Sequence, residues 1–282
     1  MAERLDEPRL KFGVPNFPGK HFLRNLIAGR TLLVQLVRRD FTQRFVGSAA
    51  GWLWGLVHPL VLLASWTFVF QWCLRSELPA GEVTNNYTMY LFTGFLPWLL
   101  FQDTVNRSAQ SLLEHSNLIT KTVFPSEIIP VSIFLSSLAN HLLSLLLVML
   151  AAGLWLEQLS PMVLVLPLYM LLTGMFAIGI GWIVAALQVY IRDTAQVLGV
   201  VMTLWFWMTP IFISPEQVPE NLRWIMKANP LAYIVRAYRE RILSWRPLSM
   251  EELMWLTAYA VGAFLIGGLF FRHLKRGFAD VL

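Results

Sequence analysis

Long apolar segments and short polar connectors alternate along most of this chain of 282 residues. Each apolar segment is about as long as the ~20 residues that a helix needs to cross a ~30 Å hydrocarbon core. No connector is large enough to form a soluble domain of its own. The pattern predicts an all-α integral membrane protein with six transmembrane helices, near residues 50–74, 86–103, 131–155, 161–189, 195–213 and 252–271.

The segment before the first predicted span has a helical period of its own. Between Lys20 and Phe45, apolar residues recur at three- and four-residue steps, while arginines lie mostly on other faces. A basic amphipathic helix of this kind can lie in the plane of the membrane surface. We therefore expect a flexible N-terminal lead over 1–19, an amphipathic cytoplasmic interfacial helix over 20–46, and a transmembrane domain over 47–282.

Two connectors carry more pattern than a simple turn. Residues 114–130 mix charged and apolar residues around Pro125, which is typical of a surface turn and also of a short helix that contacts a soluble partner. Residues 214–245 contain two short amphipathic pieces separated by Asn229 and Pro230, and both pieces are too short and too polar to span a bilayer. This second connector predicts a re-entrant helical hairpin on the external side, between spans five and six.

Composition supports the membrane assignment, and charge sets the orientation. Hydrophobic residues make up 56% of the chain and charged residues 14%, against about 45–50% and about 25% in soluble domains. Lys and Arg gather before the first span and after the last, so the positive-inside rule predicts that both termini are cytoplasmic. The basic residues of 214–251 oppose this rule, although membrane headgroups would accommodate them. The net charge of +5 fits contact with anionic headgroups rather than nucleic acid, because no soluble module carries a basic stripe.

No catalytic constellation is recognisable in the sequence. The patterns HExxH, GxSxG and CxxC are absent, and the lone Cys73 excludes an intramolecular disulfide. The closest match to a phosphate-binding loop, residues 13–21, has the wrong spacing and two prolines that remove backbone donors. We therefore expect no catalytic residue, metal or cofactor in this chain, and any ATP and Mg would be bound by a partner subunit.

Four ionisable residues in or beside the predicted spans are candidates for a function. His58 and His141 fall within spans, where such groups are functional candidates by default, but each can instead be neutral and hydrogen-bonded between helices. Asp103 and Arg107 lie four residues apart, so we expect them to pair on one helix face. A structural ion pair explains this spacing better than a proton relay.

Four stretches, taken in order, resemble the membrane subunits of ABC polysaccharide exporters, and in particular the O-antigen exporters. They are RRDFTQRFVGSAAGWLWGLVHPL (38–60), YLFTGFLPWLLFQDTVNRSAQSLLEHSNLITKTVFPSEIIP (90–130), YIRD (190–193) and LWFWMTPIFISPEQVPENLRWIMKANPLAYIVRAYRE (204–240). Each motif is loose and apolar, so the specificity lies in their ordered combination from about residue 20 to the C-terminal end. The lead over 1–19 departs from the family pattern, and we assign it no role.

The resemblance implies an ATP-driven exporter in the bacterial inner (cytoplasmic) membrane. The permease would be a homodimer that works with two copies of an ABC ATP-binding subunit and moves a lipid-linked O-antigen-type polysaccharide from cytoplasm to periplasm. Another cargo, such as a teichoic acid, a capsule, a lipid or a drug, is an alternative. A membrane-embedded glycan or lipid enzyme is a further alternative, which the absence of paired catalytic residues disfavours.

The resemblance also implies roles for particular residues, in four groups. The segment around 114–129 and the turn near 192 would contact the ATPase through Leu118, Ile119, Lys121, Phe124, Glu127, Arg192 and Asp193. The interfacial helix would be a gate where the lipid-linked chain enters, with Arg24, Arg30, Arg38, Arg39 and Arg44. Aromatic residues would line a sugar channel or, in the alternative, belt the membrane interface, namely Trp52, Trp54, Trp205, Phe206 and Trp207. The external hairpin would be a periplasmic gate with Trp224, Met226, Tyr233 and Tyr238.

Overall fold

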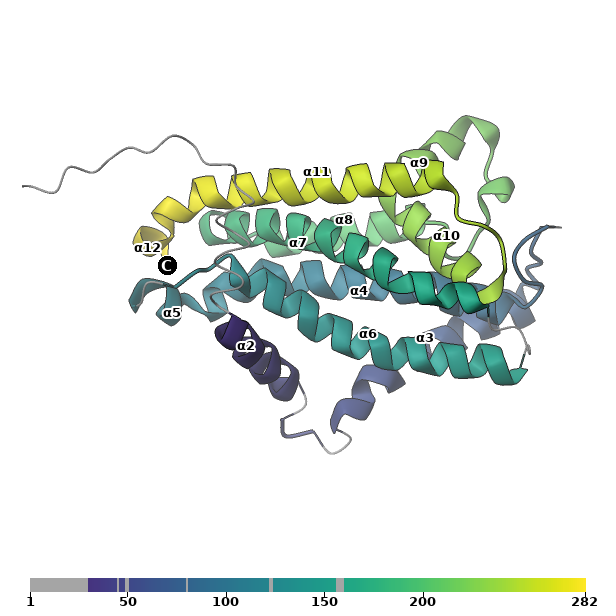
Figure 1. The fold of residues 1–282 in the computed structure, drawn as a ribbon, viewed down its shortest axis with the longest axis horizontal. Coiled ribbons are helices and arrows are strands. Elements are labelled where there is room, and N and C mark those ends of the chain that lie inside the picture. The colour runs from purple at the N-terminus through teal and green to yellow at the C-terminus, as the bar shows by residue number, and fades with distance from the viewer. Residues whose placement is uncertain (1–29, 45, 49–50, 80, 122–123, 156–159) are drawn as a thin grey trace, which may run out of the picture.

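The chain folds as a bundle of helices that run roughly along one common axis (Figure 1). A computed structural model describes residues 30–44, 46–48, 51–79, 81–121, 124–155 and 160–282. The predicted lead over 1–19 lies outside these residues, as do Arg24 and the first third of the predicted interfacial helix. Every element of regular structure in the described part of the chain is helical, which confirms the predicted all-α class.

A long or apolar helix occupies each of the six predicted spans. They are α3 (Trp54–Thr67, preceded by a 3-10 turn over Gly51–Leu53 and continued by a π-helical stretch over Phe68–Cys73), α4 (Tyr87–Glu114), α6 (Ile128–Trp155), α7 (Leu166–Tyr190, preceded by a 3-10 turn over Pro161–Val165), α8 (Thr194–Met208) and α11 (Met250–Leu274).

Among the described residues, four helical stretches are long and apolar enough to cross a membrane: Gly51–Cys73, Ile128–Leu154, Pro161–Tyr190 and Met250–Gly277. Helix α8 is apolar but only 15 residues long. Helix α4 has 28 residues, and its second half is polar. The membrane-spanning character of four stretches thus agrees with the sequence, whereas the count of six spans stays a prediction.

The shorter helices gather at the two ends of the bundle. Figure 1 shows α2 (Arg30–Gln43), α5 (Ser116–Lys121) and α12 (Phe278–Val281) toward one end, where the C-terminal end of the chain also lies. Helices α9 (Arg223–Ala228) and α10 (Pro230–Leu243) lie toward the other. We call these the α5 end and the α10 end. The connector 114–130 and the connector 214–245 are therefore at opposite ends of the bundle.

Capping residues explain where several helices begin. The side chain of Asn86 accepts the backbone N–H of Met89 at the start of α4, and Ser249 accepts that of Glu252 at the start of α11. Asn229 caps α10, whose first residue is Pro230, a residue with a preset φ and no N–H to satisfy. These polar side chains supply partners to backbone donors that a helix start leaves free.

Helices α4 and α7 form the centre of the core, and α11 packs closely on α7. Large rings such as Trp98, Phe101 and Trp182 are almost completely buried there. Helices α7 and α11 approach so closely at Gly179 and Gly267 that a Cβ on Gly267 would collide with the carbonyl of Gly179. Small residues permit this approach, which is a common device in membrane helix packing.

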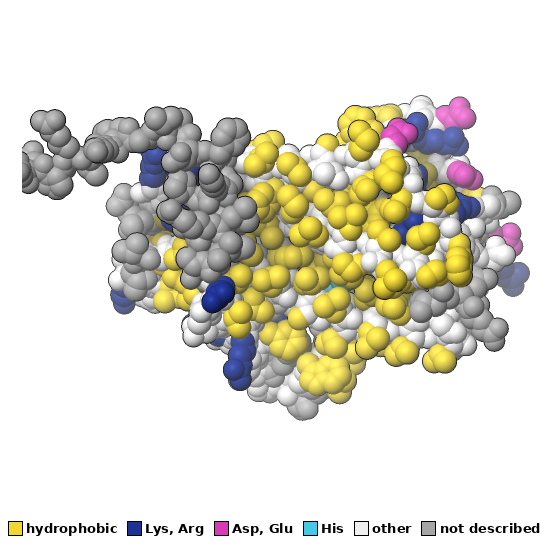
Figure 2. Space-filling model, in the orientation of Figure 1, with side chains coloured by type: hydrophobic (Ala, Val, Ile, Leu, Met, Phe, Trp, Pro, Cys, Tyr) yellow, Lys and Arg dark blue, Asp and Glu magenta, His cyan; other side chains and the backbone are white. Residues whose placement is uncertain are grey.

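Helix α10 belongs to the core, which the predicted interfacial hairpin did not suggest. It packs against α4, α7 and α11, and its side chains from Leu231 to Leu243 are mostly buried. Figure 2 shows hydrophobic side chains over most of the visible flank, with the visible acidic side chains gathered at the α10 end. This distribution fits a flank that faces lipid and an end that faces water.

We expect Gly267→Leu to separate α7 from α11 and to lower the melting temperature of the detergent-solubilised protein. Overpacking typically costs about 1–3 kcal/mol, and here the clash is with backbone, which cannot rotate away. Gly262→Leu is the matched control, because a Cβ on this α11 glycine meets open space. Equal melting temperatures for the two variants would contradict the close contact.

Candidate functional site

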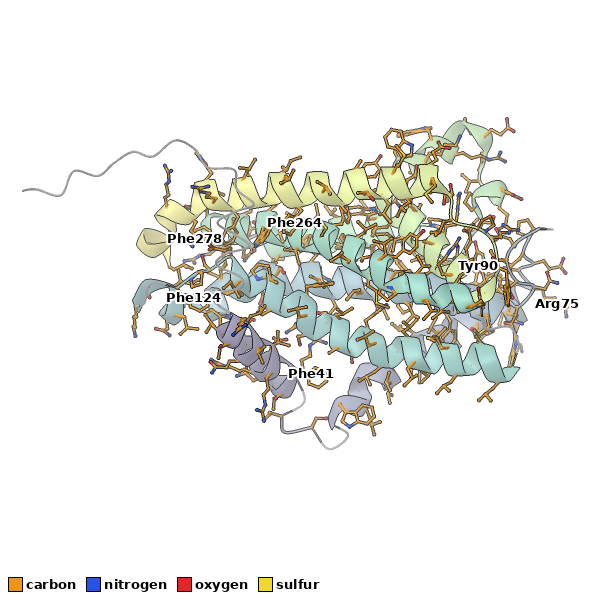
Figure 3. All side chains as sticks on the ribbon, in the orientation of Figure 1. Phe41, Arg75, Tyr90, Phe124, Phe264 and Phe278 are labelled. Atoms are coloured by element: carbon orange, nitrogen blue, oxygen red, sulfur yellow. The ribbon has the colours of Figure 1, made fainter. Side chains whose placement is uncertain are left out.

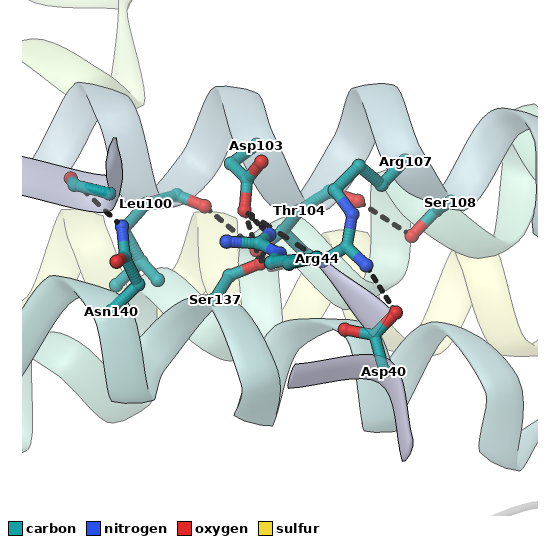
Figure 4. A network of polar contacts seen from close by, with 10 residues as sticks. Asp40, Arg44, Leu100, Asp103, Thr104, Arg107, Ser108, Ser137 and Asn140 are labelled. Atoms are coloured by element: carbon teal, nitrogen blue, oxygen red, sulfur yellow. Dashed lines mark hydrogen bonds and ion pairs between the residues drawn. The ribbon is translucent and has the colours of Figure 1, made fainter. Parts of the chain in front are cut away.

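A network of charged and hydroxyl side chains attaches α2 to the bundle (Figure 4). Arg44, in the turn after α2, donates to Asp103 of α4 and to Ser137 Oγ of α6, at 3.3 Å for the latter. Ser137 in turn donates to Asp103 Oδ2 at 2.6 Å. Arg107 of α4 donates to Asp40 of α2. We call these five residues the α2 clasp.

The charges in the α2 clasp alternate, so the Asp103 carboxylate lies between the guanidinium groups of Arg44 and Arg107, which belong to different elements. Asp103 and Arg107 form the predicted pair on one face of α4, with 3.9 Å between Nη1 and Oδ2. Each of them also bonds directly to the α2 region, Asp103 with Arg44 and Arg107 with Asp40. Because the four side chains are 17–38% exposed, their pairing is partly screened by solvent. The clasp therefore holds α2 in place through ion pairs that cost little free energy to break.

Two cavities flank the α2 clasp. A cavity of about 400 Å³ lies between α2, α4 and the start of α6, with Arg39, Gln110 and His115 among its lining residues. A second cavity of about 170 Å³ lies between α3, α4 and α6 and is lined by His58 and His141, among others. Arg44 lines both cavities, so the clasp separates them.

The arginines predicted for the interfacial helix therefore differ in environment. Arg30, Arg38 and Arg39 are exposed on α2, where they are free to meet water or headgroups. Arg44 is half-buried and bonded in the α2 clasp. The sequence did not separate these two situations, because the partners of Arg44 lie far along the chain.

The two histidines in predicted spans have different environments. His141 of α6 is buried, and its Nε2 lies 3.1 Å from the hydroxyl of Tyr238 of α10. This contact is a hydrogen bond between two helices, the structural alternative to a functional role for His141. His58 is exposed on α3 and lines the smaller cavity.

At the α5 end, most of the residues predicted to contact an ATPase cluster around two turns. Leu118 and Ile119 of α5 are half-buried, while Lys121 is exposed. Phe124 packs against a buried cluster that includes Phe271 and Phe278, and Figure 3 shows Phe124 and Phe278 at this end.

The second predicted contact is the turn between α7 and α8. Arg192 and Asp193 are both exposed there. The side chain of Gln188 fixes this turn, since its Nε2 donates to the carbonyl of Arg192 at 2.9 Å and its Oε1 accepts the N–H of Ala195 at 2.7 Å. A side-chain clamp of this kind keeps an exposed turn in one shape.

The aromatic residues predicted to line a channel fall into two groups that the fold keeps apart. Trp205 and Phe206 of α8 are half-buried among other rings, and Phe206 lies 5.6 Å from Trp66 of α3, centroid to centroid. Trp52 and Trp54 are exposed near the start of α3, about 18 Å along that helix from Trp66 at 1.5 Å per residue. Trp207 is 60% exposed at the end of α8.

The residues predicted for the external gate are also distributed between surface and core. Trp224 of α9 is exposed and Met226 is half-buried. Tyr233 is half-buried, and its hydroxyl donates to the carbonyl of Lys227 at 2.7 Å. Tyr238 is completely buried against His141. Of this hairpin, α9 is accessible and α10 is part of the core.

Sequence reasoning missed Arg239, a buried cation at the α10 end. Its guanidinium donates to the carbonyls of Tyr90, Pro210 and Ile211, at 3.1, 2.6 and 2.7 Å. It also lies 3.5 Å from the centre of the Tyr90 ring. Gly94 leaves room for it, because a Cβ there would be 2.5 Å from Nη2. Arg239 thus joins α4, α10 and the turn after α8.

A signal for Arg239 was present in the sequence. Leu231, Ile234, Val235 and Tyr238 recur at three- and four-residue steps, and Arg239 is in phase with this stripe, eight residues after Leu231. A cation on the apolar face of a helix that is buried must find partners in the protein. Here the partners are the carbonyls of Pro210 and Ile211, which the end of α8 leaves free, and the carbonyl of Tyr90 in α4.

Comparison with known proteins identifies the class to which these features belong. A family described as the ABC-2 type transporter matches residues 31–243. The chain belongs to this family of transporter membrane proteins. It is 29% identical over 267 residues to the O-antigen export system permease protein RfbA of Myxococcus xanthus, covering 92% of this chain and 98% of that protein.

Two proteins of the same name from Klebsiella pneumoniae are similar to the chain. One is 30% identical over 262 residues and the other 28% over 254, and each match covers 89% of this chain and 95% of the relative. These relatives confirm the resemblance to O-antigen exporter permeases that the ordered motifs indicated.

We expect Arg107→Ala to loosen α2, because Asp40 loses its partner. A half-exposed pair is worth up to about 1 kcal/mol, so backbone amides of α2 should exchange with deuterium up to about fivefold faster. The double reversal Asp40→Arg with Arg107→Asp should restore slow exchange. Arg38→Ala, at an exposed position of the same helix, should leave exchange unchanged, and an equal effect of Arg38→Ala would contradict the clasp.

We expect Arg239→Met to lower the melting temperature strongly, because the buried carbonyls of Pro210 and Ile211 lose their donor. Each unsatisfied buried group costs about 1–3 kcal/mol. Arg239→Lys should recover part of the loss, since an ammonium can still donate. Arg236→Met is the control on the same helix, where the partner Glu252 and the guanidinium are both partly exposed. Arg236→Met and Arg239→Met with the same melting temperature would contradict this role.

Proposed function

We propose that this chain is the channel-forming permease of an ATP-driven exporter of lipid-linked, O-antigen-type polysaccharide. The similarity to O-antigen export permeases carries the proposal, because it extends over 89–92% of this chain and 95–98% of those proteins. A homodimer works with two copies of a separate ATP-binding subunit in the bacterial inner membrane. All six predicted spans cross the membrane, and both termini are cytoplasmic.

In this proposal the α5 end faces the ATP-binding subunits. The exposed side of α5, with Lys121, and the exposed turn with Arg192 and Asp193 form the contact surface. Support comes from their location at one end of the bundle (Figure 1). The half-buried Leu118, Ile119 and the neighbouring 124–127 segment then transmit a push on α5 to the core.

Helix α2 is the gate at which the lipid-linked chain enters. It is held by the half-exposed ion pairs of the α2 clasp, which cost little to open. Its exposed Arg30, Arg38 and Arg39 suit a phosphate-bearing headgroup. Opening of α2 would join the two cavities that the clasp separates.

The polysaccharide passes between two copies of the chain, along α3 and α8. Few residues are buried in these two helices: only 6% of the most apolar stretch of Gly51–Cys73 is buried, and in α8 the buried residues are Leu198 and Met202. Exposed Trp52, Trp54 and Trp207 offer ring faces on which sugars can stack. At the α10 end, the accessible α9 with Trp224 is the part of the external gate that moves, while α10 stays in the core.

The ATPase contact is tested by Asn117→Trp with Lys121→Glu, both at exposed positions of α5. We expect co-purification with the ATP-binding subunit and cargo-dependent ATP hydrolysis to fall at least tenfold, the effect of about 1.4 kcal/mol at an interface. The melting temperature of the permease alone should not change. Glu251→Lys, a charge reversal at an exposed position at the α10 end, is the control, and an equal loss with Glu251→Lys would sink the assignment of the α5 end.

The cargo is tested separately, with the purified complex in vesicles. Lipid-linked O-antigen should stimulate ATP hydrolysis and become protected inside inverted vesicles. Stimulation by a different lipid or polymer, with none by O-antigen, would retain the exporter and replace its cargo. Turnover of a glycan lipid by the permease alone would instead support an enzyme.

A further inference from the structure

The chain does not leave the bundle after α11 but turns back toward α5. A 3-10 turn (Lys275–Gly277) leads into α12 (Phe278–Val281), and Figure 1 shows α12 beside α5. We call residues 275–282 the return segment. Neither the motifs of the sequence nor the proposed function gives it a role.

The return segment contacts the loop that follows α5. Lys275 Nζ pairs with the carboxylate of Glu127 at 2.5 Å, and the two side chains are 35% and 20% exposed. The backbone carbonyl of Glu127 also accepts a hydrogen bond from Trp182 Nε1 of α7 at 3.0 Å. Leu282 packs on the same buried cluster as Phe124. One side of the return segment is therefore attached to the α5 loop.

The return segment and the end of α11 also contact the end of α7, directly before the exposed turn. The hydroxyl of Tyr190 donates to the carbonyl of Leu274 at 2.8 Å. Phe278 is 1% exposed, with its ring centroid 6.1 Å from that of Tyr190 and 5.4 Å from that of Phe271. Gly277 lies so close that a Cβ there would be 2.6 Å from Tyr190 Oη.

We infer that the return segment is a positioning strut, which fixes the α5 loop and the turn with Arg192 and Asp193 relative to each other. Glu127 and Tyr190 lie directly beside the two parts of the surface that contacts the ATP-binding subunit in the proposed function, on which this inference rests. They are far apart in sequence, and Lys275 and Phe278 join them. A subunit that pushes on α5 would then move the α7–α8 turn with it, as one surface.

A positioning strut differs from a segment that only stabilises the end of the bundle. A purely stabilising segment would affect the melting temperature and leave the ratio of cargo exported to ATP hydrolysed unchanged. A strut would affect this coupling ratio even where the fold is intact. The half-exposed Lys275–Glu127 pair is suited to the test, because such a pair adds little to stability.

The experiment uses the full chain in complex with its ATP-binding subunit. Lys275→Glu and Glu127→Lys should each lower the coupling ratio at least threefold, with an unchanged melting temperature and an intact complex. The double exchange should restore most of the ratio. Arg276→Glu makes the same charge change at an exposed neighbouring position and should leave the ratio unchanged. A ratio unaffected by both single variants, or lowered equally by Arg276→Glu, would overturn the strut.

A second measurement uses the permease alone and so does not depend on the proposed function. Gly277→Ala should push the Tyr190 hydroxyl away and raise deuterium exchange at least threefold in the 191–194 turn. Gly262→Ala, in open space on α11, should not. Equal exchange in both variants would also overturn the strut. Failure of the wild-type complex to hydrolyse ATP or export cargo would instead remove the proposed function, and normal coupling in all variants would remove only the strut.

Discussion

A polar group buried away from water must find its partner within the protein, because neither lipid nor apolar side chains offer one. The fold of this permease depends on that constraint at the ends and breaks of its helices. Where α8 ends, the carbonyls of Pro210 and Ile211 have no helical partner, and Arg239 supplies their donors. Where α6 passes α10, His141 and Tyr238 satisfy each other. Buried side chains of α10 therefore form hydrogen bonds with backbone carbonyls and a side chain of neighbouring elements. These bonds explain why a segment with several charged residues lies in the core.

Packing is uneven across the bundle in a way that fits the proposed transport. Helices α4, α7 and α11 are held together by close backbone approach and large buried rings, such as Trp98 and Trp182. In helices α3 and α8 few side chains are buried. The closely packed helices α4, α7 and α11 would form the core of one protomer. The sparsely buried α3 and α8 would be available to contact a second copy and the cargo.

The sequence predicted the helices well and their polar contacts poorly, for physical reasons. Long apolar runs fix a membrane helix by themselves, so each of the six predicted spans coincides with a helix. The pair Asp103–Arg107 was predicted because its spacing is local. Its partners Arg44 and Asp40 are 59 and 67 positions away. No local pattern marks such partners, and the same holds for Lys275 and Glu127, 148 positions apart.

The two ends of the bundle differ in how their polar contacts resist change. At the α5 end, the α2 clasp and the Lys275–Glu127 pair are partly exposed, and breaking such a pair costs up to about 1 kcal/mol. At the α10 end, Arg239 and the His141–Tyr238 contact are buried, and leaving a buried polar group without its partner costs about 1–3 kcal/mol, and more for a charged group. Movement is therefore less costly at the end where α2, α5 and the return segment lie. A protein driven from that end by a separate subunit can rearrange there while its α10 end keeps the helices in register.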